Sequence, residues 1–109
     1  MERAVRSVMR SKAAHALTSS KHEGLLAELT KAEPDMLVVS ELCRRARLSW
    51  PDSLQGDRGV VGVEIAAMNE ALAELEAAAK GGYETAFDRA RFAYLFARER
   101  LAAISMMRR

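Results

Sequence analysis

The sequence predicts an all-α fold, a small bundle of four or five helices that ends in a long antiparallel helical hairpin. Half of its 109 residues are hydrophobic, and most of these are Ala and Leu, which favour helices, whereas β-branched residues are sparse. Only two prolines and six glycines interrupt regular structure. Apolar residues recur at spacings of three and four through the last fifty positions. The length fits a single domain, residues 1–109.

The first expected helix spans residues 2–17. Arg3, Arg6 and Arg10 lie three and four residues apart, so they form a basic stripe along it. Thr18, Ser19 and Ser20 then interrupt the pattern. We therefore expect a break before the second helix.

The second expected helix spans residues 21–33. Ser20 and Glu23 are spaced as in a capping box, in which each side chain bonds a free backbone N–H of the first turn. Pro34 disfavours the helical conformation of the residue before it, so the helix should end by about Glu33. Its buried edge consists of Leu25, Leu26 and Leu29.

A third helix is expected over residues 36–48. Residues 36–39 alone would also suit a short strand, but Val38, Leu42 and Ala46 continue at helical spacing. No second strand candidate exists for pairing. Residues 50–59, rich in Gly, Pro, Asp and Ser, predict a loop.

The predicted hairpin joins helices over residues 60–80 and 83–107. Gly81 and Gly82 between them suit a helix stop and a tight turn. Each helix has one apolar stripe at alternating spacings of four and three, and Glu64, Glu70, Glu74 and Glu76 lie outside the first stripe. The stripes are Val61, Ile65, Met68, Leu72, Leu75, Ala79 and then Tyr83, Phe87, Ala90, Tyr94, Ala97, Leu101, Ile104.

The last helix carries a second apolar side, opposite its first stripe. Either the N-terminal helices cover this side, or it is presented to a protein partner or to a second copy of the chain in a homodimer. Exposed Phe and Met side chains suit a partner surface. The candidate partner-binding residues are Phe92, Phe96, Met106 and Met107.

The net charge of +2 is the sum of alternating basic and acidic blocks. Residues 23–43 and 52–80 are mainly acidic, whereas residues 1–22, 44–47 and 81–109 are mainly basic. In a helical bundle such blocks can lie against one another and form ion pairs. The alternative is that the basic blocks bind nucleic acid.

Residues 41–54 resemble the middle of a DNA-binding helix-turn-helix. Cys43 matches its small residue, Ala46 and Leu48 flank the turn, and Pro51 opens the next helix. Arg47 stands where that family usually has Gly, so the motif, around residues 38–56, is degenerate. The resemblance implies a nucleic-acid-binding regulator in which Arg44, Arg45 and Arg47 neutralise phosphates.

A third function class follows from Arg10 and His15, whose spacing resembles the active-site motif of the HEPN ribonucleases. Apart from this motif, the sequence contains no glycine-rich phosphate-binding loop and no Asp or Glu that pairs with His at the spacing of metal ligands. It also contains no arrangement of residues typical of a catalytic nucleophile. We therefore expect no cofactor, metal or small-molecule substrate, and no enzymatic activity.

Cys43 is the only cysteine, which fits a small core residue in a cytoplasmic protein. No stretch is long and apolar enough for a membrane span. The prediction is a non-enzymatic adaptor that binds a partner or itself through its C-terminal helix.

Overall fold

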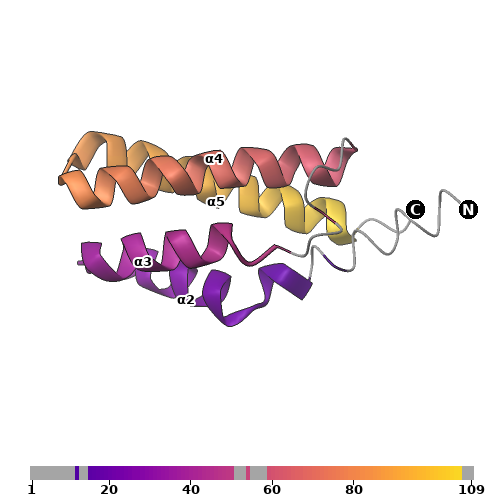
Figure 1. The fold of residues 1–109 in the computed structure, drawn as a ribbon, viewed down its shortest axis with the longest axis horizontal. Coiled ribbons are helices and arrows are strands. Elements are labelled where there is room, and N and C mark those ends of the chain that lie inside the picture. The colour runs from indigo at the N-terminus through magenta and orange to yellow at the C-terminus, as the bar shows by residue number, and fades with distance from the viewer. Residues whose placement is uncertain (1–11, 13–14, 51–53, 55–58, 107–109) are drawn as a thin grey trace, which may run out of the picture.

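The computed structural model describes residues 12, 15–50, 54 and 59–106, and it confirms the all-α fold with a C-terminal hairpin. These residues form four long helices and no strand: α2 (Ser20–Leu29), α3 (Met36–Arg47), α4 (Val60–Gly81) and α5 (Glu84–Met106). The α4–α5 hairpin lies against the pair formed by α2 and α3 (Figure 1). Of the helix expected over residues 2–17, residues 12 and 15–17 are helical, and the remainder lies outside the described residues.

Helix α2 starts one residue before its predicted start and ends four residues before its predicted end. The helix begins at Ser20, and its N-cap is Ser19, which makes no side-chain capping hydrogen bond, rather than the predicted Ser20. It ends at Leu29, before the predicted Glu33, because the next residues turn back toward α3. The Glu28 carboxylate stabilises this turn by accepting hydrogen bonds from the Asp35 backbone N–H and from Lys31 Nζ, both at 2.9 Å.

Helix α3 forms where it was predicted, because Asp35 caps its start. The Asp35 carboxylate accepts hydrogen bonds from the backbone N–H groups of Leu37 (3.0 Å) and Val38 (3.4 Å). The buried face is Val39, Ser40, Cys43 and Ala46, whereas Val38 is 39% exposed.

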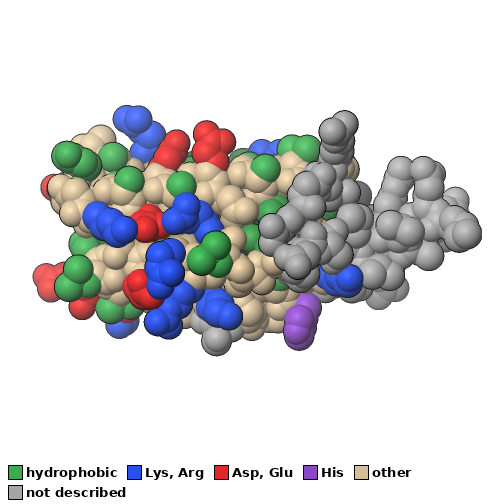
Figure 2. All heavy atoms as spheres, in the orientation of Figure 1, with side chains coloured by type: hydrophobic (Ala, Val, Ile, Leu, Met, Phe, Trp, Pro, Cys, Tyr) green, Lys and Arg blue, Asp and Glu red, His purple; other side chains and the backbone are tan. Residues whose placement is uncertain are grey.

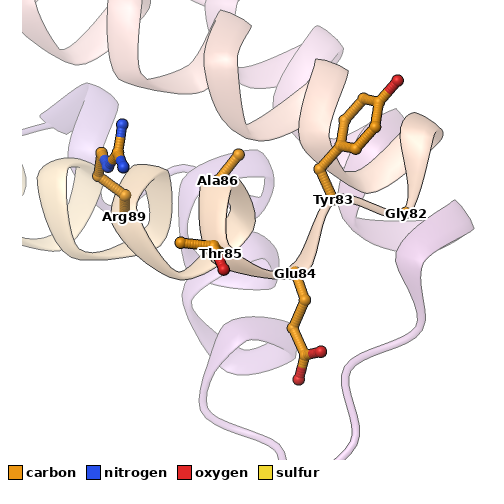
Figure 3. Close-up of a pocket in the computed structure, with 6 residues that line it drawn as sticks. All are labelled: Gly82, Tyr83, Glu84, Thr85, Ala86 and Arg89. Carbon is orange, nitrogen blue, oxygen red and sulfur yellow. The ribbon is translucent and has the colours of Figure 1, made fainter.

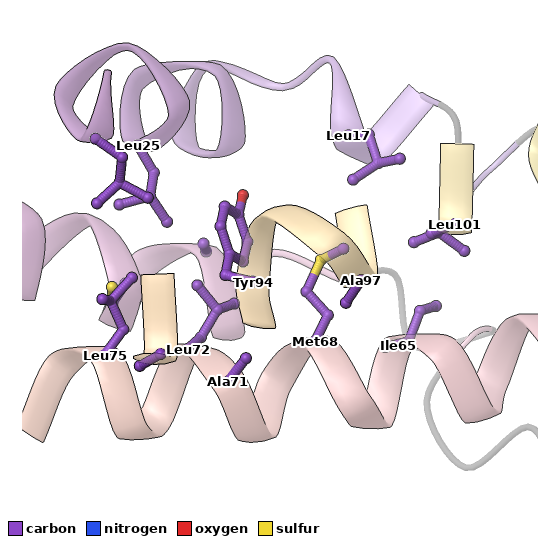
Figure 4. Packing of buried hydrophobic residues seen from close by; sticks show 14 of the residues in the cluster. Leu17, Leu25, Ile65, Met68, Ala71, Leu72, Leu75, Tyr94, Ala97 and Leu101 are labelled. Carbon is purple, nitrogen blue, oxygen red and sulfur yellow. The ribbon is translucent and has the colours of Figure 1, made fainter. Parts of the chain in front are cut away.

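The hairpin core follows the predicted stripe of α4, all six residues of which are buried. Figure 4 shows Met68, Leu72 and Leu75 of this stripe in the core. Gly82 ends α4 in the left-handed conformation, with φ of 69°, and donates its N–H to the Ala78 carbonyl, as expected of a helix stop. Tyr83 departs from its stripe and is 67% exposed, because it lies in the turn before α5 begins.

Two glutamates of α4 that were placed outside the stripe, Glu64 and Glu76, are buried. Helix α4 packs against α5 on one flank and against α3 on the other, so its buried face is wider than one stripe. Glu64 pairs with Arg100 of α5 at 2.7 Å, and Glu76 pairs with Arg47 of α3. These contacts, together with a pair between Glu23 and Arg98, join acidic blocks to basic blocks across helices.

Candidate functional site

The second apolar side of the last helix is open to solvent at Phe92 and Phe96, which are 71% and 52% exposed. The two rings stack with centroids 6.2 Å apart and an interplanar angle of 16°. Phe87, Tyr94 and Leu101 on the opposite side of α5 are buried. Within the described part of the chain, no N-terminal helix covers the phenylalanines. Met107 and the Met106 side chain lie outside the described residues.

Thr85 and Ala103 extend this side of α5 toward the two ends of the helix. Thr85 lies seven residues before Phe92, and Ala103 lies seven residues after Phe96, so all four share one face, and all four are exposed. We call these four residues the α5 outer face. The Arg100 guanidinium lies 5.7 Å from the Phe96 ring centroid and also pairs with Glu64, so it holds the edge of this face in place.

A depression of about 560 Å³ lies where the hairpin turn meets the start of the α5 outer face. It is lined by Gly82, Tyr83, Glu84, Thr85, Ala86 and Arg89 (Figure 3). Every lining residue is exposed, so the depression is open and does not enclose a ligand.

The arginines of the predicted nucleic-acid site all have acidic partners. Arg44 and Arg45 both pair with Glu41, at 2.6 and 3.0 Å, and Arg47 pairs with Glu76. Basic and acidic side chains are intermixed over the face formed by α3 and α4 (Figure 2). Most of the segment that would form the second helix of the resembled motif, residues 51–53 and 55–58, lies outside the described residues.

Sequence reasoning did not find a polar cluster in the core. His22 of α2 is fully buried, and its Nδ1 lies 3.1 Å from the hydroxyl of Tyr94, which points toward α2 (Figure 4). The His22 ring also contacts Trp50, with centroids 4.8 Å apart, and the Trp50 indole donates to Asn69 of α4 at 2.9 Å. No local pattern links His22 to Tyr94, because the two residues are 72 positions apart.

Burial shifts the ionisation of this cluster. Desolvation and the positive charge of Arg98 lower the pKa of His22 to about 4, so the ring is neutral at neutral pH. Desolvation raises the pKa of Tyr94 to about 12. Both groups therefore stay uncharged inside the bundle.

Cys43 is buried, as expected of a core residue. Desolvation and the nearby Glu76 raise the pKa of its thiol to about 12, so it is not a reactive thiolate. His15 is exposed, whereas Arg10, its partner in the resembled ribonuclease motif, lies outside the described residues. Within the described ranges, no group of three or more His, Cys, Asp and Glu side chains is placed to hold a metal ion.

The chain matches no known protein-family model, and neither a curated protein nor a solved structure is significantly similar to it. Among the residues described, no helix combines the length and the apolar character needed to cross a membrane.

Proposed function

We propose that this protein is a non-enzymatic interaction domain, an adaptor that binds a protein partner through the α5 outer face. One observation carries the proposal: Phe92 and Phe96 are stacked on each other and exposed, on a 23-residue helix whose opposite side lies in the core. An exposed aromatic pair on a fixed helix is typical of the centre of a protein interface.

The energetics favour binding at this face. Each Å² of apolar surface removed from water contributes roughly 25 cal/mol, and aromatic rings are the side chains most enriched in interface centres. Because Phe87, Tyr94 and Leu101 anchor α5 in the core, the helix that carries the two rings is held in position before binding. A partner therefore meets a surface that loses little conformational entropy on binding.

The ionisable groups support a non-enzymatic function. Among the described residues, the three whose pKa values shift furthest are His22, Cys43 and Tyr94, which are fully buried and cannot reach a substrate. Catalytic acids and bases need a shifted pKa together with access to a cleft. The depression beside the outer face is open and lined by exposed residues.

Site-specific photo-crosslinking tests the proposal. A benzophenone amino acid replaces Phe96, and the protein is irradiated in its native cells. We expect a discrete crosslinked product. The same replacement at Leu37 of α3, which is 81% exposed and lies away from the outer face, is the matched control and should give none. Equal crosslinking at both positions, or none at Phe96, would overturn the proposal.

A further inference from the structure

We propose that the partner of the α5 outer face is a second copy of this chain, whose α5 runs parallel to the first. This inference rests on the proposed function and identifies its partner. The inference comes from the charged residues that flank the two phenylalanines. These residues are basic along one edge of the face and acidic along the other.

The α5 outer face has one basic edge and one acidic edge. At 3.6 residues per turn, Arg89 and Arg100 fall on one side of the phenylalanines, and Asp88 and Glu99 fall on the other. All four are exposed. Arg100 also pairs with Glu64 and Asp88 with Arg91, yet 58% and 60% of their side-chain surfaces remain open for a partner.

Symmetry decides which pairing of two copies these edges allow. When two identical helices pair in parallel, a two-fold axis runs along them, and the basic edge of each copy faces the acidic edge of the other. Arg100 then lies opposite the partner's Glu99, and Arg89 lies opposite the partner's Asp88. The pairing is complementary on both flanks.

Antiparallel pairing gives the opposite result. Its two-fold axis is perpendicular to the helices, so each edge meets the same edge of the partner. With Phe92 opposite the partner's Phe96, Arg89 faces the partner's Arg100, and Asp88 faces the partner's Glu99. Like charges would oppose each other on both flanks, which disfavours this arrangement.

The centre of the parallel pairing is apolar. Phe92 and Phe96 each meet their own counterparts, so rings from both copies cluster midway along the helix. Thr85 and Ala103 lie toward its ends and are small enough to let the backbones approach. A helix of 23 residues is about 34 Å long and offers less area than the ~800 Å² per partner of a standard interface, so we expect a dissociation constant on the order of micromolar.

Disulfide crosslinking distinguishes the two directions. Thr85→Cys and Ala103→Cys are made separately and oxidised near 100 μM, a concentration chosen from the expected micromolar affinity. In parallel pairing each new cysteine meets itself, so each variant alone gives disulfide-linked dimers. In antiparallel pairing Thr85 faces the partner's Ala103, so only a mixture of the two variants crosslinks efficiently.

Two controls set the background. The unmodified chain reports on Cys43, which is buried and should not crosslink. Ala66→Cys places a thiol on an exposed position of α4, away from the outer face. We expect at least about tenfold more dimer from each α5 variant than from either control. Crosslinking found only in the mixture, or no excess over the controls, would overturn the parallel pairing.

The photo-crosslinking product separates this inference from the proposed function. A product at Phe96 with twice the mass of the chain supports both. A product that contains a different protein supports the interaction domain but overturns the self-pairing. No product at Phe96 overturns both.

Discussion

Among single residues, His22 links the stability of the fold to pH. Its pKa is about 4 in the folded chain and about 6.5 when unfolded, so between these values the unfolded state binds the additional proton. Stability from this residue is complete above pH 6.5 and is lost as the pH falls toward 4. From these two pKa values, we expect the free energy of unfolding to fall by about 2 kcal/mol between pH 7 and pH 5.

Urea unfolding at both pH values measures this loss. His22→Gln cannot titrate in this range, so its unfolding free energy should change by about 2 kcal/mol less than that of the wild type. His15→Gln changes the other histidine, which is exposed, and should keep the wild-type pH dependence. Identical pH dependence in the wild type and His22→Gln would contradict the assignment of a neutral, buried ring.

Among structural elements, the hairpin turn depends on the conformation of Gly82. An added Cβ at Gly82 has no atom within 4 Å, so Gly82→Ala tests the positive φ alone. We expect it to lower the unfolding free energy by about 1 kcal/mol, and Gly82→Asn by less, because Asn tolerates this conformation better.

Gly24→Ala is the matched control, since Gly24 lies inside α2 and its added Cβ would be 3.7 Å from Leu42, an ordinary contact. It should raise stability by roughly 0.5–1 kcal/mol. Thermal unfolding of the variants compares the two positions. If Gly82→Ala raised the unfolding free energy, the hairpin turn would not require the left-handed conformation of Gly82.

One of the three arginines at the end of α3 forms an ion pair with α4. Arg47 is about one-third exposed and pairs with Glu76, which is buried, whereas Arg45 shares the half-exposed Glu41 with Arg44. Among the residues that the structure describes, removing Arg47 leaves Glu76 paired with Lys80 alone. We expect Arg47→Ala to cost about 1–2 kcal/mol and Arg45→Ala less than about 0.5 kcal/mol in urea unfolding. If both variants lost the same unfolding free energy, the ion pair between Arg47 and Glu76 would contribute no more to stability than the exposed pair between Arg45 and Glu41.

The sequence predicts those elements whose signals are local. The alternating spacing along α4 and the two glycines after it were enough to place the hairpin. The end of α2 was not predictable in this way, because it depends on Glu28 binding the Asp35 backbone across the turn. The burial of Glu64 and Glu76 was not predictable either, since it depends on arginines from other helices.

At the scale of the whole molecule, the candidate site was predicted only in part. Helical spacing identified Phe92 and Phe96 as a second apolar side of the last helix. The spacing did not decide whether this side lies in the core or at the surface, because the answer depends on where α2 and α3 pack. In the fold, α2 and α3 contact the other sides of the hairpin. The charged edges that indicate a second copy follow from the same spacing once the face is known to be exposed.

The proposed self-pairing predicts that the stability of the whole molecule depends on its concentration. A dimer that forms only from folded chains adds about 0.7 kcal/mol per chain for each tenfold rise in concentration above the dissociation constant. For a chain of this size, that corresponds to a rise in Tm of about 3–5 °C. Phe92→Ser with Phe96→Ser should abolish the rise, whereas Leu37→Ser, which removes an apolar side chain of α3 that is even more exposed, should retain it. Calorimetry over two decades of concentration measures the effect. A wild-type Tm that stays constant, or a rise that persists without the two phenylalanines, would show that α5 does not pair with itself.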